Sequence, residues 1–502
     1  MAITSPLVLP EIRESLAPFL TSDDLARCVR VCKAWHASFL PFLWGSIEVS
    51  ADKGSQPSLD FMQQHCDSIR RLIYHGKVPM DHIPLVYPVL RTLHLLQVKS
   101  IESGHDPALD IITAHPSLTH LRLQSVTPGA PISRWILPTN MSSLNTLSLT
   151  GIVLVIKDMD GFWKLLLQLE TLEMAYSGLA SGHYRAPEGD WKLKSLSLVL
   201  NYGMSQNDQL AWIRRCTRLR RLQWRALCFP RQFPIEEFTQ SVVEKTWPEL
   251  EDLSLVRCGA SDQQLSLIIS GMRRVLGLSV TYGDLRELSM AALRPHFPWI
   301  RHLDVLRNFG STKELTVEVL RRCPRLETLR ANRIPAHEVI EGPRWACEKT
   351  LKVLEVCFQV VAGVAGAAGT TRGEEDEGKE GKERKERNRL LERIARLVQL
   401  ERLDISNQDE SPMEVSSVVL SKKKGMEQLG RLTHLREVCV EYTQQESTVE
   451  DVEWMIQQWP SLRRVEGTLH TADPLCSRAL MGRLSQAGIA VRQLSAYRPF
   501  AR

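Results

Sequence analysis

Apolar residues recur along most of this chain in the pattern leucine-x-x-leucine-x-apolar. The clear copies are LRTLHL from Leu90, LTHLRL from Leu118, LNTLSL from Leu144, LETLEM from Leu169, LKSLSL from Leu193, LRRLQW from Leu219, LEDLSL from Leu250, VLGLSV from Val275, IRHLDV from Ile300, LETLRA from Leu326 and LKVLEV from Leu351. Weaker copies start at Ile69, Leu400, Leu435 and Leu462. Successive clear copies lie 24 to 31 residues apart, which identifies a sequence repeat.

Each copy predicts one short strand. In LTHLRL, Leu121 and Leu123 flank Arg122, so on an extended chain the leucines point to one side and the arginine to the other. One copy cannot bury its leucines alone, and neighbouring copies must therefore stack into a parallel sheet. The period and the leucine spacing are those of leucine-rich repeats.

The segments that precede the strands have helical spacing. In DQLAWIRRCTRL, Leu210 and Ile213 are three residues apart, and VEWMIQQWPSL places Met455 and Trp459 four apart. A proline often follows and ends the helix before the next strand. We therefore predict an α/β fold, a leucine-rich-repeat solenoid of about 15 units over residues 47–500, shaped as a horseshoe with a parallel inner sheet and outer helices.

One interval is longer than the others, from Leu351 to Leu400. It contains residues 361–387, a run rich in glycine and charge that has no aromatic residue. We predict that this run is a disordered insertion within the solenoid. It is either a contact or modification site or a tolerated lengthening of a loop, because longer loops cost little free energy.

The N-terminal segment follows another pattern. Its apolar spacing predicts three short helices, from Pro10 to about Leu20, from Asp23 to about Val31 and from Lys33 to Leu43. Ser22 is expected to cap the second helix. A unit of this size cannot build a sufficient hydrophobic core by itself. Its apolar side chains should therefore contact another surface.

The LPEI sequence from Leu9, the stretch DLARCVRVCKAW from Asp24 and the LW at Leu43 resemble an F-box, which we place at residues 5–46. The chain is similar to F-box proteins with leucine-rich repeats, fungal members especially. The resemblance implies a substrate-recognition subunit of an SCF-type ubiquitin ligase, bound to a Skp-type adaptor and through it to a cullin–RING core. The adaptor-binding residues that it implies are Leu9, Pro10, Ile12, Leu16, Leu20, Leu25, Val31, Cys32, Trp35, Leu43 and Trp44.

Two other interpretations of the same features stay open. The N-terminal helices, with Trp35 and Trp44, could cap the open end of the solenoid in a binding scaffold that is no ligase subunit. The repeats could also hold a small polyanion. That role would need a basic cluster on the strands, and Arg122, Arg225 and Arg330 are too dispersed to form one.

Composition narrows the function further. Hydrophobic residues make up 43% of the 502 residues, and the net charge is only +5, with basic and acidic residues interspersed, so we expect no nucleic-acid partner. We see neither a signal peptide nor an apolar run long enough for a membrane span. The 11 cysteines have no paired spacing, which favours reduced thiols and a cytoplasmic or nuclear protein.

No catalytic or cofactor motif stands out. In GEEDEGKE from Gly373, Glu380 occupies the position where a phosphate loop needs Ser or Thr. Cys28, Cys32 and His36 are four residues apart, but no partner pair completes a zinc site. We therefore expect no enzyme activity, no cofactor and no metal site.

Target contacts are expected on the polar positions of the strands, which point away from the leucine core. The candidates are Arg122, Gln124, Ser148, Ser197, Gln223, Ser254 and Asp304. The sequence predicts that these side chains bind a protein target.

Overall fold

The computed structural model describes residues 6–50, 57–76, 82, 84–98, 107–125, 133–135, 141–154, 159–179, 189, 191–201, 204–225, 233–309, 312–360, 375–406 and 418–492. The chain divides into two compact units. Unit 1 comprises Met1–Pro234 and Thr246–Glu249, and unit 2 comprises Ile235–Lys245 and Leu250–Arg502. In the described part of the chain, no helix has both the length and the hydropathy needed to cross a bilayer.

Unit 1 begins with three short helices, α1 (Pro10–Leu16), α2 (Ser22–Cys28) and α3 (Lys33–Leu43). Two 3-10 turns, η1 (Pro6–Val8) and η2 (Ala17–Phe19), flank α1. The first helix is thus shorter than predicted, because Pro18 cannot donate a backbone hydrogen bond to continue it. The cap of α2 is Thr21 and not Ser22: Thr21 accepts from the backbone N–H of Asp24, which reciprocates in a capping box.

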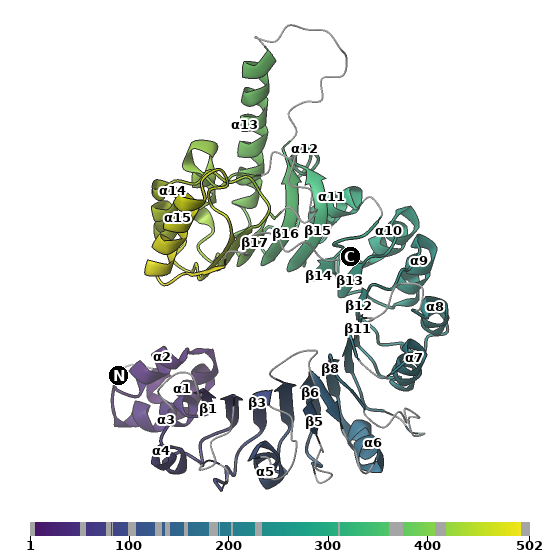
Figure 1. The fold of residues 1–502 in the computed structure, drawn as a ribbon, viewed down its shortest axis with the longest axis vertical. Helices are drawn as coiled ribbons and strands as arrows, with labels where there is room; N and C mark the ends of the chain where they lie inside the picture. Colours follow the sequence, from purple (N-terminus) through teal and green to yellow (C-terminus); the bar gives the residue numbers. More distant parts are fainter. Residues whose placement is uncertain are drawn as a thin grey trace. The chain divides into compact units, whose positions relative to one another are not determined.

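The main sheet of unit 1 is parallel (Figure 1). Its strands are β1 (Ser46–Ser50), β2 (Arg71–His75), β3 (Thr92–Val98), β4 (His120–Ser125), β6 (Thr146–Thr150), β8 (Thr171–Ala175), β10 (Ser195–Val199) and β11 (Arg221–Arg225), paired in this order. A smaller parallel sheet joins β5 (Ser133–Trp135), β7 (Ile152–Leu154) and β9 (Gly178–Leu179). The helices α4 (Leu59–Gln64), α5 (Pro107–Ala114), α6 (Met159–Gln168) and α7 (Gln206–Arg215) complete the unit.

Unit 2 repeats the arrangement. Its parallel strands are β12 (Asp252–Val256), β13 (Gly277–Thr281), β14 (His302–Asp304), β15 (Thr328–Pro335), β16 (Val353–Gln359), β17 (Arg402–Asp404), β18 (Glu437–Val440), β19 (Arg464–Gly467) and β20 (Ala490–Arg492). Its helices are α8 (Ile235–Val243), α9 (Asp262–Gly271), α10 (Glu287–Leu293), α11 (Lys313–Arg322), α12 (Ala336–Ile340), α13 (Glu375–Ile394), α14 (Val449–Gln458) and α15 (Pro474–Gln486), with the 3-10 turns η5 (Arg294–His296), η6 (Lys422–Lys424) and η7 (Met426–Arg431).

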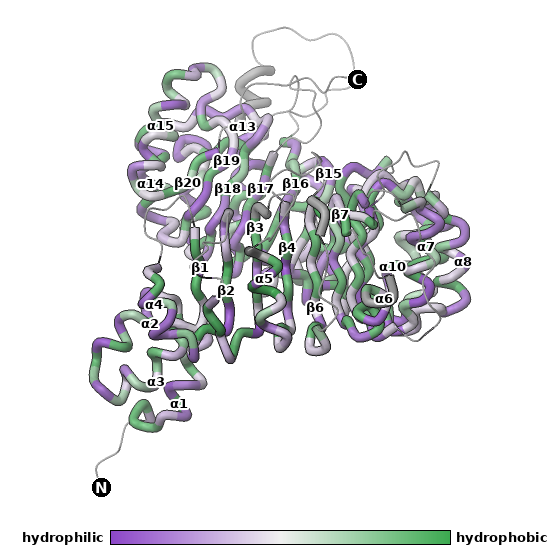
Figure 2. Tube along the Cα trace, turned by 60° about the horizontal axis from the view of Figure 1, so that its bottom comes forward, coloured by the Kyte–Doolittle hydropathy of each residue, from purple (hydrophilic) through white to green (hydrophobic). Residues whose placement is uncertain are grey.

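The leucines of the repeat form the core of both units. Leu93, Leu121 and Leu147 occupy the same register position on β3, β4 and β6, and each is fully buried. The alternation of hydrophobic and hydrophilic residues along the strands is visible in Figure 2. We call the side of each sheet that carries the polar strand positions the strand face. The large parallel sheet is consistent with the predicted repeat solenoid.

Not every repeat has the predicted helix before its strand. Residues 84–91, before β3, form turns, and η6 and η7 are the regular elements between β17 and β18 among the described residues. Pro84 and Pro88 explain the first case, because each lacks the N–H that a helix would use. Among the residues that the structure describes, these two intervals contain no α-helix, which differs from the predicted order of helix, turn and strand.

The predicted insertion also differs from expectation in its second half. Residues 361–374 lie outside the described residues, but residues 375–387 are helical and belong to α13. The prediction of disorder is wrong for this part. Leu390, Leu391 and Ile394 are completely buried and anchor the helix, so the charged residues before them extend a helix that has already formed.

Candidate protein-interaction surfaces

The three N-terminal helices share a small core of their own. Ala17, Leu25 and Phe39 are buried together. The side chains that pack around them are only partly buried, and they are Leu20, Cys28, Val29, Trp35, Phe42 and Leu43. At the start of α2, the hydrogen bond from the Thr21 hydroxyl lowers the pKa of Asp24, so the capping carboxylate stays charged. A local cap thus stabilises α2, and a few shared apolar contacts hold the three helices together.

A buried arginine connects these helices. Arg13 of α1 is 3% exposed, and its Nε donates to Ser38 Oγ of α3 at 2.9 Å. Its terminal nitrogen donates to the backbone carbonyls of Leu7 and Val8, at 2.9 and 2.8 Å. One charged side chain therefore fixes η1 and α1 against α3, and sequence patterning did not single it out.

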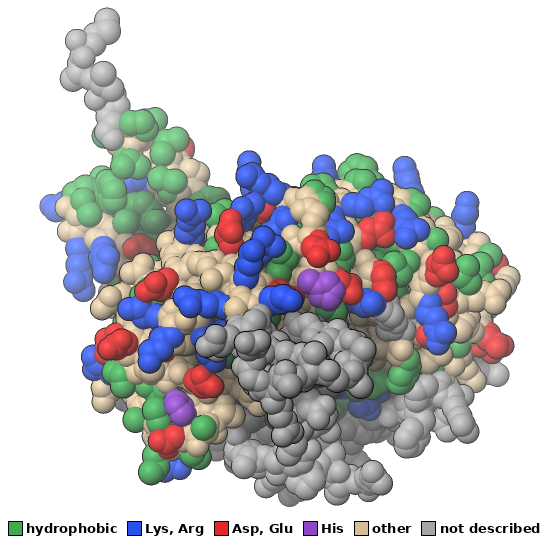
Figure 3. All heavy atoms as spheres, turned by 90° about the horizontal axis from the view of Figure 1, so that it is seen from above, with side chains coloured by type: hydrophobic (Ala, Val, Ile, Leu, Met, Phe, Trp, Pro, Cys, Tyr) green, Lys and Arg blue, Asp and Glu red, His purple; other side chains and the backbone are tan. Residues whose placement is uncertain are grey.

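Several large apolar side chains of this segment remain on the surface. We call the following residues the N-terminal apolar patch: Leu7, Val8, Leu9, Ile12, Leu16, Phe19 and Val31. Their exposed fractions lie between 37% and 84%, and Phe19 is the most exposed. Figure 3 shows hydrophobic side chains gathered on the N-terminal segment at its upper left. Exposed apolar side chains that cluster on a protein commonly mark an interaction site.

The structure separates the predicted adaptor-binding residues into three groups. Leu9, Pro10, Ile12, Leu16, Val31 and Cys32 are exposed. Leu20, Trp35 and Leu43 are partly buried around the helical core, and Leu25 lies inside that core with 7% exposure. Leu25 therefore supports the surface from within and cannot itself face a partner. The sequence motif did not single out Leu7, Val8 and Phe19 as surface residues. Pro18 was the one sequence feature that indicated a turn next to Phe19.

Trp44 has a separate place. Its ring packs edge-on against Phe61 of α4 at a centroid distance of 4.8 Å, and it also lies 5.0 Å from the ring of His65. These contacts join the end of α3 to the next part of unit 1. Trp44 therefore packs against the part of the chain that follows the helices, as the capping interpretation expects.

The predicted target-binding residues occupy aligned positions on the strand faces. In unit 1, Arg122, Ser148, Ser197 and Gln223 share one row across β4, β6, β8, β10 and β11, and Gln124 lies in the next row. In unit 2, Ser254 and Asp304 share a row with Ser279 between them. Ser148 is only 7% exposed, and burial raises the pKa of Asp304. Glu173 and His94 occupy the same row and are further candidates for target contact.

Positive charge gathers at one end of the strand face of unit 1. His94 pairs in register with Arg122, and Arg71 and His120 lie close by on β2 and β4. Burial, followed by the positive charges of Arg71 and Arg122, lowers the pKa of His94 to about 4. His94 is therefore neutral at pH 7 and does not add to the charge of the arginines.

The strand face of unit 2 carries a charge network around Arg402 of β17. Its guanidinium lies 2.7 Å from Glu437, 3.1 Å from Asp404 and 3.9 Å from Glu466. Burial lowers the pKa of Arg402, but the hydrogen bonds that Arg402 donates to Asp404 and Glu437 outweigh it and raise this pKa. The arginine thus neutralises acids from three strands.

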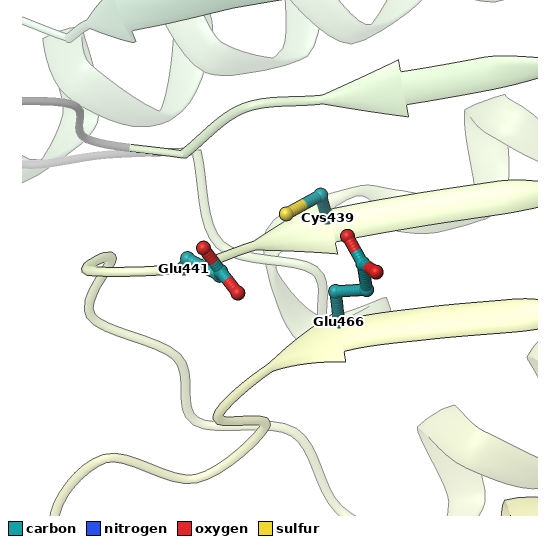
Figure 4. Close-up of side chains that lie close together, drawn as sticks. All are labelled: Cys439, Glu441 and Glu466. Carbon is teal, nitrogen blue, oxygen red and sulfur yellow. The ribbon is translucent and has the colours of Figure 1, made fainter. Parts of the chain in front are cut away.

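Beside this network, Cys439, Glu441 and Glu466 place their ligand atoms within 4.8 Å of one another (Figure 4). Cys439 and Glu466 are register partners on β18 and β19, and Glu441 directly follows β18. Ser406 donates to the Cys439 sulfur at 3.1 Å, and burial raises the pKa of that thiol to about 12. Three ligands of this kind fall short of the four of a structural zinc site.

Comparisons with known proteins add little to this geometry. No family model matches the sequence, and no curated protein matches it. A solved structure described as the crystal structure of Rad7 and Elc1 complex in yeast matches with a TM-score of 0.33 and 11% identity, covering 96% of this chain and 91% of that chain.

Proposed function

We propose that this chain is a substrate-recognition subunit of an SCF-type ubiquitin ligase. Its N-terminal helices would bind a Skp-type adaptor, and the strand faces of its repeats would bind a protein target. The observation that carries the proposal is the N-terminal apolar patch, on the segment whose sequence resembles an F-box. The chain itself would make no bond but would raise the effective concentration of a target lysine near the ubiquitin donor.

The N-terminal apolar patch exposes apolar area on ordered helices. Leaving Val31 at 61% and Phe19 at 84% exposure in water is unfavourable, and a partner that covers these side chains recovers this free energy. Large apolar side chains on short, ordered helices are typical of the centre of a protein interface. Arg13 and the buried trio Ala17, Leu25 and Phe39 keep the patch ordered before binding.

Co-purification with a Skp-type adaptor tests the proposal. Phe19→Asp and Val31→Asp place a charge in the patch, and we expect each to weaken adaptor binding about tenfold or more. Matched controls are Phe309→Asp and Val449→Asp, which alter apolar residues of unit 2 that are 74% and 58% exposed. The controls should bind as the wild type does. Absence of adaptor binding by the wild-type chain would contradict the proposal.

A second candidate is a binding scaffold in which the helices only cap the repeats. The contacts of Trp44 with Phe61 and His65 favour it, because they bind the helical segment to its own chain. The two candidates differ in what the patch does. A scaffold would bind its target equally well after Phe19→Asp, and it would never co-purify with the adaptor.

A further inference from the structure

A groove of about 820 Å³ lies between α13 and η7 in unit 2. From α13 and the residues just after it, the lining includes Arg384, Lys385, Asn388, Arg389, Glu392 and Arg396, and from η7 it includes Glu427, Gln428 and Arg431. Its volume lies in the range of ligand-binding pockets, about 300–1,000 Å³.

The walls of this groove are held firmly. Arg393 donates to the carbonyls of Pro343, Ile340 and Gly342 at 2.9, 3.0 and 2.7 Å, so one side of α13 is fixed to the end of α12. On α13, Leu390 and Leu391 are completely buried. The groove residues therefore project from a helix whose position does not depend on a ligand.

The charge of the groove is only partly neutralised. Its two acids already have partners, since Glu392 pairs with Arg396 at 2.9 Å and Glu427 pairs with Lys422 at 3.6 Å. The remaining cations, Arg384, Lys385, Arg389 and Arg431, are exposed, and within the described ranges none of them forms an ion pair. Four positive charges face one groove, so its occupant should be an anion.

Asn388 and Gln428 place neutral amides among these cations. A side-chain amide both donates and accepts hydrogen bonds. An acidic peptide offers backbone N–H and C=O groups together with its carboxylates, so it can use the amides as well as the cations.

The length of the groove agrees with a peptide. Gly381 and Glu392 line it 11 residues apart on α13, which corresponds to about 17 Å along the helix axis. An extended chain rises about 3.3 Å per residue, so roughly five residues span this distance. We propose that the groove between α13 and η7 binds a short, extended acidic peptide segment of another protein. This site is independent of the proposed adaptor site and of the strand faces.

Fluorescence anisotropy with a labelled hexaglutamate peptide and the full chain tests this proposal. We expect saturable binding that weakens with added salt, and about five- to tenfold weaker binding in the Arg389→Gln/Arg431→Gln double variant. The matched control is Arg273→Gln/Arg463→Gln, which removes the same charge from exposed positions of unit 2 outside the groove. Thermal unfolding of each variant checks that the fold is intact.

The two variants distinguish binding in the groove from attraction by net charge. Loss of binding in the groove variant alone supports the site. Equal loss in the control variant shows that net charge alone attracts the peptide, and this overturns the proposal, as does absence of binding to the wild type. Tripolyphosphate and a six-nucleotide deoxythymidine oligomer serve as competitors. If either displaces the peptide at a lower concentration than unlabelled hexaglutamate does, the site prefers phosphate, and the assignment to an acidic peptide is wrong.

Discussion

Arg13 Nε donates a hydrogen bond of 2.9 Å to Ser38 Oγ, although the two residues are 25 positions apart in the chain. The guanidinium is almost fully buried and also binds the carbonyls of Leu7 and Val8, which belong to the N-terminal apolar patch. The exposed apolar surface thus depends on a buried charged group beneath it. Arg13 is a positioning residue for the proposed adaptor contact.

Replacing Arg13 should disturb the patch more than it disturbs the repeats. Arg13→Met removes three hydrogen bonds of a charged group and should destabilise the helical segment by about 2–3 kcal/mol. Amide hydrogen exchange should show lost protection in η1, α1 and α3, with little change in β12 to β16. Arg30→Met, at an exposed position of the same segment, is the control. Unchanged exchange at α1 would show that Arg13 does not hold it.

Trp44 should tie the helices to unit 1. Trp44→Ala removes the ring contacts with Phe61 and His65 and should cost about 2 kcal/mol locally, because the side chain is only half-buried. We expect faster limited proteolysis between α3 and β1, while Trp299→Ala, at a surface tryptophan of unit 2, leaves that region protected. If the variant also keeps adaptor binding, the capping and adaptor-binding roles of the segment are separable.

The titration of His94 should depend on its neighbours. Its folded-state pKa of about 4 lies below its ordinary value of 6.5, so the neutral form is favoured by folding. The stability that this provides is present above pH 6.5 and is lost as the pH falls from 6.5 to about 4. NMR titration of the His94 ring should show its midpoint near 4, and Arg122→Gln should move it to higher pH. Arg221→Gln, on distant β11, should leave it in place.

Arg402 should stabilise the strand face of unit 2 through its ion pairs. Arg402→Met leaves Asp404, Glu437 and Glu466 without their shared cation, and removal of one partner from a largely buried ion pair costs about 3 kcal/mol or more. Urea unfolding at pH 7 measures the loss. Arg492→Met, at a 69% exposed side chain, should cost under 1 kcal/mol.

The contacts of two asparagines follow from their positions in the repeat. Asn308 falls three residues after the last strand apolar of IRHLDV, as Asn201 does after LKSLSL. In the structure, Asn308 accepts from the N–H of Gly283 and donates to the carbonyls of Val280 and Val305. Asn201 accepts from the N–H of Ser177 in the preceding repeat. Both asparagines link successive repeats, and their position in the repeat consensus is enough to predict these links.

The spacing of apolar residues determined the strands and the core by itself. Leu121 and Leu123 alternate with Arg122, and this period places the leucines inside and the arginine on the strand face wherever the strand lies in the fold. Repetition of the pattern then requires parallel stacking, because each strand buries its leucines only against its neighbours.

Only the tertiary structure decided which residues of short, irregular elements are accessible. Leu25 and Phe19 are both apolar residues of the N-terminal segment, yet one is 7% exposed and the other 84%. The ion pairs of Arg402 with Glu437 and Glu466, and the groove beside α13, join residues of separate elements that lie far apart in the sequence, so no local period encodes them. Local periodicity specifies the direction of a side chain within its own element, whereas its neighbours depend on the path of the whole chain.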